Sequence, residues 1–313
     1  MSKTLVLPPD AAGIARAAAL LAQGGLVAMP TETVYGLAGD ARDDRAVAGI
    51  FAAKGRPRFN PLIVHLASLD AVEEFAVLTP LARQLAAAFW PGPLTLVLPL
   101  RGGLSPLVTA GQDTVAIRLP AHPVARALLD AFGGPLAAPS ANPSGRISPV
   151  SARHVLDGLD GRIAAVIDGG DCAVGLESTI LDVTGAAPVL LREGGLAVEA
   201  VQALGLTLGA RTSEAITAPG QMASHYAPRG RVRLGVTAPE AGEVWVGFGP
   251  CPGARLSLSE AGDLTEAAAQ LFHALHAADA LAGPQGRIGF APVPELGLGR
   301  AINDRLRRAA APR

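Results

Sequence analysis

A cationic, proline-bounded segment leads directly into an apolar run: Lys54-Gly55-Arg56-Pro57-Arg58-Phe59-Asn60-Pro61 is followed by Leu62-Ile63-Val64-His65-Leu66. The run predicts a buried strand, and the glycine and prolines predict a stiff loop before it. Cations held on a stiff loop at a strand edge suit a phosphate. The alternative is a solvated turn after a helix, where cations also interact favourably with the helix dipole. Only two of the 26 basic residues are lysine, and Lys54 is one of them.

Strand and helix patterns alternate on both sides of this segment. Apolar runs predict strands at residues 26–29, 62–66, 94–98, 114–120, 135–138, 163–167, 178–183 and 189–192. Amphipathic segments between them predict helices, the first capped by Asp10 and a later one by Thr79 with Pro80 at its first position. The alternation indicates an α/β fold.

The chain divides into two predicted units. Residues 206–229 lose the apolar periodicity, and a smaller α/β pattern of Rossmann-like type follows them. We therefore expect a first α/β unit at 1–205, a linker at 206–229 and a C-terminal α/β unit at 230–313.

Composition excludes several classes of protein. Of 313 residues, 50% are hydrophobic and 17% charged, which is typical of a globular chain. The net charge of −1 gives no overall attraction to nucleic acid. No apolar run reaches the roughly 18 residues of a membrane-spanning helix. The two cysteines lack a zinc-site spacing, and without a signal peptide we expect a cytoplasmic protein.

Cations and small polar donors recur at the predicted strand ends. They are Thr33, Lys54, Arg56, His65, Arg118, Ser140, Asn142, Ser178 and Arg192. If they converge, they suit a polyphosphate together with a carboxylate. An exposed ion pair contributes only about 0–1 kcal/mol, whereas a pair in a partly closed site is worth about 4 kcal/mol. The cluster is therefore useful only in a sheltered cleft. No phosphate loop and no nucleophile motif accompanies it.

Each candidate also has a structural interpretation. His65 fits a core histidine, and Ser140 and Ser148 fit turns or caps. Arg118 interrupts an apolar strand, so it either pairs with a protein carboxylate or awaits a ligand. His273 and His276 on a predicted helix, and Cys172, are expected to be structural or inert.

Several motifs together resemble the threonylcarbamoyl-AMP synthase (YrdC-like) family. They are Pro30-Thr31-Glu32-Thr33-Val34-Tyr35-Gly36-Leu37, Lys54-Gly55-Arg56-Pro57, Phe59-Asn60-Pro61-Leu62, Trp90-Pro91-Gly92-Pro93-Leu94-Thr95 and Pro139-Ser140-Ala141-Asn142. The linker segment His225-Tyr226-Ala227-Pro228, with the α/β unit after it, resembles the two-domain form of that family. The resemblance implies a YrdC-like catalytic domain with a twisted sheet and a deep basic cleft.

The resemblance also implies an activity. A nucleotidyltransferase would use ATP, L-threonine and bicarbonate to make L-threonylcarbamoyladenylate and pyrophosphate, with Mg²⁺ as cofactor. The product would pass to a tRNA-modifying transferase complex that acts on the adenosine beside the anticodon. A weak tRNA contact is possible, and no membrane is involved.

The family's site residues map onto this sequence by motif. The catalytic cations would be Lys54 and Arg56, and threonine would contact Thr33, His65, Arg118 and Ser178. ATP would contact Arg56, Asn60, Thr114, Ala138, Ser140, Asn142, Ser148, Arg192 and, at the position after the His-Tyr-Ala-Pro segment, Arg229. His225 and Tyr226 are predicted to form a lid over the cleft, and the metal ligands are not indicated.

A rival interpretation is a non-catalytic module that binds structured RNA, such as tRNA or the ribosome. The basic loop fits it, but the net charge and the few aromatic residues do not. A third possibility is carbamoyl transfer to another acceptor.

Overall fold

A mixed ten-stranded sheet forms the first unit of the protein. The computed structural model describes residues 3–57, 59–210 and 225–312. The strands are β1 (Leu5–Leu7), β2 (Val27–Met29), β3 (Gly36–Asp40), β4 (Ile63–His65), β5 (Leu94–Pro99), β6 (Thr114–Arg118), β7 (Leu136–Ala137), β8 (Ala165–Ile167), β9 (Thr179–Asp182) and β10 (Val189–Arg192). They are ordered β1-β8-β2-β3-β7-β4-β6-β5-β9-β10, so most neighbours in the sheet are distant in sequence.

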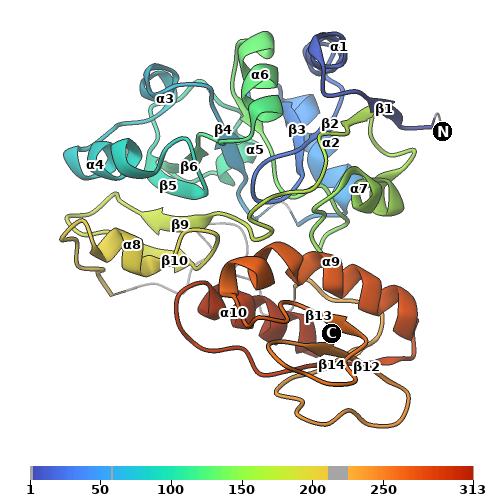
Figure 1. The fold of residues 1–313 in the computed structure, drawn as a ribbon. Helices are drawn as coiled ribbons and strands as arrows, with labels where there is room; N and C mark the ends of the chain where they lie inside the picture. Colours follow the sequence, from blue (N-terminus) through green and yellow to red (C-terminus); the bar gives the residue numbers. More distant parts are fainter. Residues whose placement is uncertain (1–2, 58, 211–224, 313) are drawn as a thin grey trace.

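Helices cover both faces of this sheet. They are α1 (Ala11–Ala22), α2 (Asp44–Lys54), α3 (Leu69–Phe75), α4 (Pro80–Phe89), α5 (Pro106–Thr109), α6 (Pro123–Phe132), α7 (Ala152–Leu159) and α8 (Val198–Gln202). Strand β2 illustrates the layering, because successive strand residues point to opposite faces. Val27 and Met29 pack in one apolar cluster with α1 and α6, while Ala28 packs in another with α2. Figure 1 shows α1 and α6 together at one side of the unit.

Both predicted caps are confirmed, because the Asp10 and Thr79 side chains accept hydrogen bonds from the Gly13 and Ala82 amides at the starts of α1 and α4. The helix that delivers the cationic loop is capped in the same way. The Asp43 side chain accepts a hydrogen bond from the Arg45 amide at the start of α2, and Gly55 ends the helix with φ of 60°. A left-handed residue at this position favours glycine, which carries no Cβ. The chain can therefore turn sharply from Lys54 into the loop.

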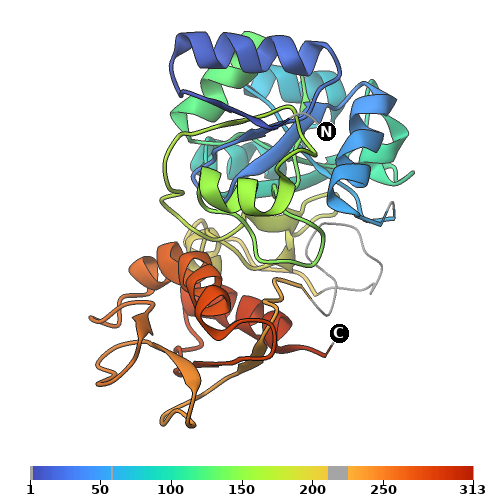
Figure 2. The same ribbon diagram turned by 90° about the vertical axis from the view of Figure 1, so that its right-hand side faces the viewer.

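A smaller parallel sheet forms the second unit. Its strands β11 (Arg231–Arg233), β12 (Glu243–Gly247), β13 (Leu256–Ser257) and β14 (Arg287–Phe290) are ordered β11-β14-β12-β13. Helices α9 (Leu264–Ala282) and α10 (Leu298–Ala310) complete it. Figures 1 and 2 show this unit, in orange and red, on one side of the first, with α9 and α10 on the facing side.

The α/β prediction is confirmed for both units, with local differences. Strand β3, which begins at Gly36 and pairs with β2, is not among the predicted strands. Strand β1 was not predicted, because Leu5 and Val6 lie on an exposed edge and give no buried pattern. Among the helices in the described part of the chain, none combines the length and the apolar character needed to cross a membrane.

Candidate active site

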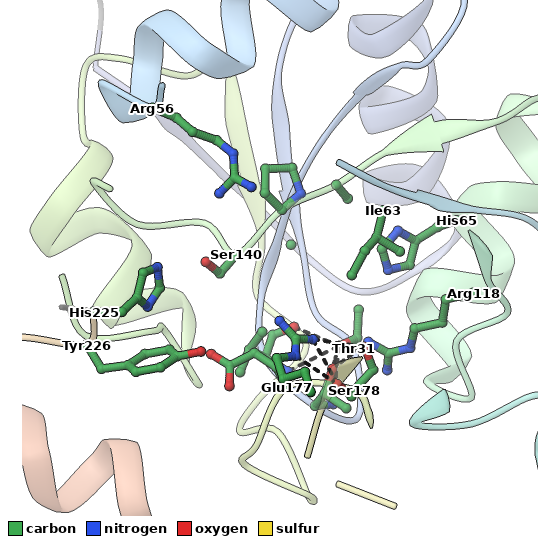
Figure 3. Close-up of a pocket in the computed structure, with 16 residues that line it drawn as sticks. Thr31, Arg56, Ile63, His65, Arg118, Ser140, Glu177, Ser178, His225 and Tyr226 are labelled. Carbon is green, nitrogen blue, oxygen red and sulfur yellow. Dashed lines mark hydrogen bonds between the residues drawn. The ribbon is translucent and has the colours of Figure 1, made fainter. Parts of the chain in front are cut away.

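A narrow pocket of about 50 Å³ lies where several strands of the large sheet begin or end. Most of the residues predicted from the sequence line it. They are Thr33, Arg56, His65, Arg118, Ala138, Ser140, Ser178, Arg192, His225 and Tyr226. Figure 3 shows His65 and Arg118 on one side of this pocket, and Arg56, Ser140 and His225 on the other. The two ends of the pocket are therefore lined by different sets of side chains.

Arg118 is held at one end by a carboxylate and a hydroxyl. Its Nη2 donates to Oε1 of Glu32 at 2.6 Å, and its Nη1 donates to Oγ1 of Thr33 at 2.7 Å. Its Nε donates to the carbonyl of Gly92 at 3.2 Å. The sequence left open whether Arg118 pairs with a protein group or faces a ligand. The structure shows that it pairs with Glu32 and also lines the pocket.

His65 is buried beside Arg118. Burial, assisted by the positive charge of Arg118, lowers the pKa of its imidazole to about 3. The ring is therefore neutral at physiological pH. Its Nδ1 is buried without a hydrogen-bond partner among the described residues, which is unlike a satisfied core histidine. A ligand hydroxyl or amine in the pocket would supply that partner.

Ser178 connects the two ends of the pocket. Its hydroxyl is 2.7 Å from Oγ1 of Thr95, and its carbonyl accepts from Nη2 of Arg192 at 2.8 Å. Nη2 of Arg192 is also 3.2 Å from the Ser178 hydroxyl. The guanidinium of Arg192, at the end of β10, is thereby fixed beside the start of β9.

Arg56 belongs to the other end, and its loop holds it in place. Its Nη2 donates to the carbonyl of Pro61 at 3.0 Å and its Nε to that of Asn60 at 3.3 Å. Burial, with the nearby charge of Arg192, lowers the pKa of this guanidinium to about 10. The interpretation as a solvated turn is therefore wrong for Arg56. Asn60 is itself buried behind the loop.

Lys54 does not line the pocket. Its ammonium is buried and donates to the carbonyls of Ser140 and Asn142. Burial, followed by the charge of Arg56, lowers its pKa well below the usual range. The lysine thus fixes the Ser140-Ala141-Asn142 segment from behind, and the Asn142 amide donates to the carbonyls of Pro143 and Arg146.

Two glutamates take part that the sequence analysis did not assign. Glu32 anchors Arg118 and accepts from the Ala121 amide at 3.0 Å. Glu177 lines the pocket and accepts from the Ser148 hydroxyl at 2.6 Å. Ser148 is therefore neither a cap nor a turn residue. Glu32 directly precedes Thr33, and Glu177 directly precedes Ser178. This adjacency to predicted site residues is the sequence signal that could have identified both glutamates.

Other predicted residues lie outside this pocket. Thr114 begins β6 opposite Pro99. Arg229 donates to both carboxylate oxygens of Asp279, at 2.6 Å from its amide and 2.9 Å from its Nε. Together with Asn142 it lines a second cavity of about 840 Å³ between the two units. Their nucleotide contacts remain predictions.

The two residues predicted to form a lid, His225 and Tyr226, line the pocket. The rings of His225 and Tyr226 meet edge to face with centroids 4.1 Å apart, and Tyr226 is almost completely buried. Residues 211–224 of the predicted linker lie outside the described residues.

The residues expected to be structural or inert have ordinary packing. His276 stacks on His154 with ring centroids 3.8 Å apart, and His273 lies 5.3 Å from the same ring. Cys172 is buried, and burial raises the pKa of its thiol to about 12. Within residues 3–57, 59–210 and 225–312, no group of three or more His, Cys, Asp or Glu side chains is placed to hold a metal ion.

Two family models match the chain. The Sua5/YciO/YrdC model, described as telomere recombination, matches residues 19–194, and the model of the C-terminal domain of threonylcarbamoyl-AMP synthase matches residues 196–311. Threonylcarbamoyl-AMP synthase of Bacillus subtilis (strain 168) is 40% identical over 96% of this chain and 93% of its own length. The enzyme of the same name from Pyrococcus abyssi is 47% identical over 69% of this chain and 66% of its own.

Solved structures share the fold. A crystal structure of P. abyssi Sua5 complexed with L-threonine has a TM-score of 0.88 at 38% identity, covering 99% of this chain and 98% of that one. Escherichia coli YciO has a TM-score of 0.57 at 25% identity and covers 62% of this chain. The match to Sua5 extends over both units of this chain, whereas the match to YciO has about the length of the first unit alone.

Proposed function

This chain belongs to the threonylcarbamoyl-AMP synthase family and is an enzyme of the nucleotidyltransferase type; from that premise we propose that it condenses L-threonine, bicarbonate and ATP into L-threonylcarbamoyladenylate and pyrophosphate. The product would serve a tRNA-modifying transferase that acts on the adenosine beside the anticodon. We place this reaction in the cytoplasm.

The observation that carries the proposal is the division of one pocket into two ends. Arg118, Thr33 and His65 offer a cation, a hydroxyl and a neutral imidazole, which suit the carboxylate and hydroxyl of an amino acid. Arg56 and Arg192 offer guanidinium groups, which suit phosphates. Threonine at the first end would place its amine toward the nucleotide.

The proposed reaction requires that the reactants are aligned and that water is excluded from the pocket. The amine of threonine attacks the carbon of bicarbonate, and a water molecule leaves to give a carbamate. An oxygen of this carbamate then attacks the α-phosphorus of ATP while pyrophosphate leaves. Carbamates decompose in water, so a buried pocket protects the intermediate. Alignment of the reactants can supply about 7–11 kcal/mol of the barrier. The guanidinium groups of Arg56 and Arg192 would stabilise charge on the phosphates.

The linker is proposed to open and close this pocket. A volume of about 50 Å³ is too small for a nucleotide and an amino acid together. His225 and Tyr226 line the pocket from the linker, so their displacement would enlarge it. A chain truncated after Leu204 is expected to lose ATP affinity. Full activity with unchanged ATP affinity in the truncated chain would refute the proposed role of the linker as a lid.

A reconstitution assay tests the proposed function. Pyrophosphate release should require ATP, threonine and bicarbonate together, and mass spectrometry should detect the adenylate. Omission of any one substrate is the internal control. Steeply salt-dependent RNA binding without turnover would instead favour the RNA-binding module.

A further inference from the structure

Arg305 is a buried arginine that the second unit places against the wall of the pocket. It lies on α10 with 0% of its side chain exposed. Its Nε donates to Oε2 of Glu177 at 3.0 Å, and its Nη1 donates to the carbonyl of Glu193 at 2.5 Å. Its guanidinium also lies over the ring of Tyr226, 5.7 Å from the centroid. The second unit therefore reaches a pocket residue and a lid residue with one side chain.

A second contact from the same unit supports this wall. Nε2 of His276, on α9, donates to the carbonyl of Ser148 at 3.1 Å. The hydroxyl of Ser148 in turn donates to Oε1 of Glu177 at 2.6 Å. Both oxygens of the Glu177 carboxylate are thus occupied, one by Ser148 and one by Arg305. The pair Ser148–Glu177 is held between α9 and α10.

The charge of Glu177 explains why this arrangement matters. The proposed nucleotide end would receive phosphates, and a buried carboxylate beside them repels them unless a cation compensates it. Burial acts to raise the pKa of Glu177, but the charges of Arg305 and Arg192 with the Ser148 hydrogen bond outweigh it and lower the pKa. Glu177 therefore stays ionised and depends on its cations.

We propose that Arg305 is a positioning residue for the nucleotide end of the pocket: it neutralises Glu177, so that this buried carboxylate does not repel the phosphates of the nucleotide. In this role the second unit contributes to the site, because α10 supplies the guanidinium that pairs directly with Glu177. The inference rests on the proposed function. It goes beyond it by assigning a role to a residue outside the YrdC-like unit.

Substitution of the ion pair tests this role. Arg305→Gln should raise the dissociation constant for a non-hydrolysable ATP analogue by roughly tenfold or more, because Glu177 is left uncompensated. The dissociation constant for threonine, which binds at the Arg118 end, should change by less than about twofold. The double variant Glu177→Gln/Arg305→Gln should recover much of the loss, as should Arg305→Lys. A loss in the double variant equal to that in the single variant would overturn the proposal.

Arg300→Gln is the matched control. Arg300 lies on the same helix and joins the units through ion pairs with Glu193 and Glu199, without contact to Glu177. It should weaken the interface and leave the affinity for the ATP analogue within about twofold of wild type. An equal loss of affinity in this control would show a general effect of the interface and would also overturn the proposal.

These binding measurements are independent of turnover. If the wild-type protein releases no pyrophosphate from ATP, threonine and bicarbonate, the proposed function fails, whereas the comparison of analogue affinities still decides the role of Arg305. If Arg305→Gln does not fold, the double variant and Arg305→Lys carry the test. Similar threonine and nucleotide losses in them would indicate a merely structural role.

Discussion

His65 and Arg118 stand directly opposite each other on the adjacent parallel strands β4 and β6. The strand pairing brings together an imidazole and a guanidinium that are far apart in the sequence. Both side chains are almost completely buried, and both line the same pocket. This arrangement defines the end of the pocket at which we place threonine, and the first two predictions concern it.

Arg118→Gln should weaken threonine binding. The substitution removes a charged hydrogen-bond donor, worth about 1.5–3 kcal/mol, and leaves Glu32 buried without its cation. We expect the dissociation constant for threonine to rise roughly 10- to 100-fold in calorimetry. Arg42→Gln is the control, because its pair with Asp40 is partly exposed and worth about 0–1 kcal/mol. Unchanged threonine affinity in Arg118→Gln would contradict this assignment.

His65 should make the protein less stable in mild acid. Its pKa is lowered from 6.5 to about 3 in the folded state, so below pH 6.5 the unfolded chain binds a proton that the folded chain does not. The free energy of unfolding should therefore fall by about 1.4 kcal/mol per pH unit from this group as the pH drops from 6.5 toward 3.

His65→Asn isolates this contribution. Urea unfolding at pH 7 and pH 5 should show a smaller loss of stability in the variant than in the wild type, by roughly 2 kcal/mol. Other buried imidazoles contribute with the same sign but are common to both proteins. Equal losses in the two proteins would mean that His65 is protonated in the folded state.

Lys54→Met should lower both stability and activity. The carbonyls of Ser140 and Asn142 would lose their shared ammonium donor, and each unsatisfied buried acceptor costs about 1–3 kcal/mol. Because these carbonyls flank the Ser140 side of the pocket, we also expect a lower kcat. Lys3→Met is the matched control, since Lys3 is the other lysine of the chain and is exposed. A kcat of Lys54→Met equal to that of this control would show that the segment keeps its shape without the ammonium.

Mg²⁺ is expected to enter with ATP. Phosphate oxygens are ligands of the kind that Mg²⁺ prefers, so we expect the phosphates of ATP to supply most of its ligands. Chelation should abolish turnover, and added Mg²⁺ should restore it. Titration of the protein alone should show no tight Mg²⁺ site, whereas titration with an ATP analogue present should show one. A tight site in the protein alone would contradict this prediction.

Local signals in the sequence were sufficient for most of the individual elements and for most of the pocket residues. The caps at Asp10 and Thr79 depend on neighbouring residues only, so they could be predicted. Polar residues at strand ends could also be identified, because they interrupt apolar runs. The resemblance to the family rested on the same short motifs.

The ionic partners of buried side chains, which are distant in the sequence, could not be predicted from local patterns. Nothing near Arg118 in the sequence points to Glu32, and nothing near Glu177 points to Arg305 on the last helix. Lys54 was expected at the phosphates, yet it holds the carbonyls of the Ser140–Asn142 segment.

What the sequence by itself determined was the kind of chemistry: guanidinium groups, hydroxyls and an imidazole at the ends of buried strands, on an α/β chain with a second unit. What only the tertiary structure decided was which charges neutralise one another and which remain directed into the pocket. The physical reason is that helix caps and strand periodicity arise between close neighbours in the chain, whereas sheet order and burial bring distant side chains together and thereby set their ionic partners.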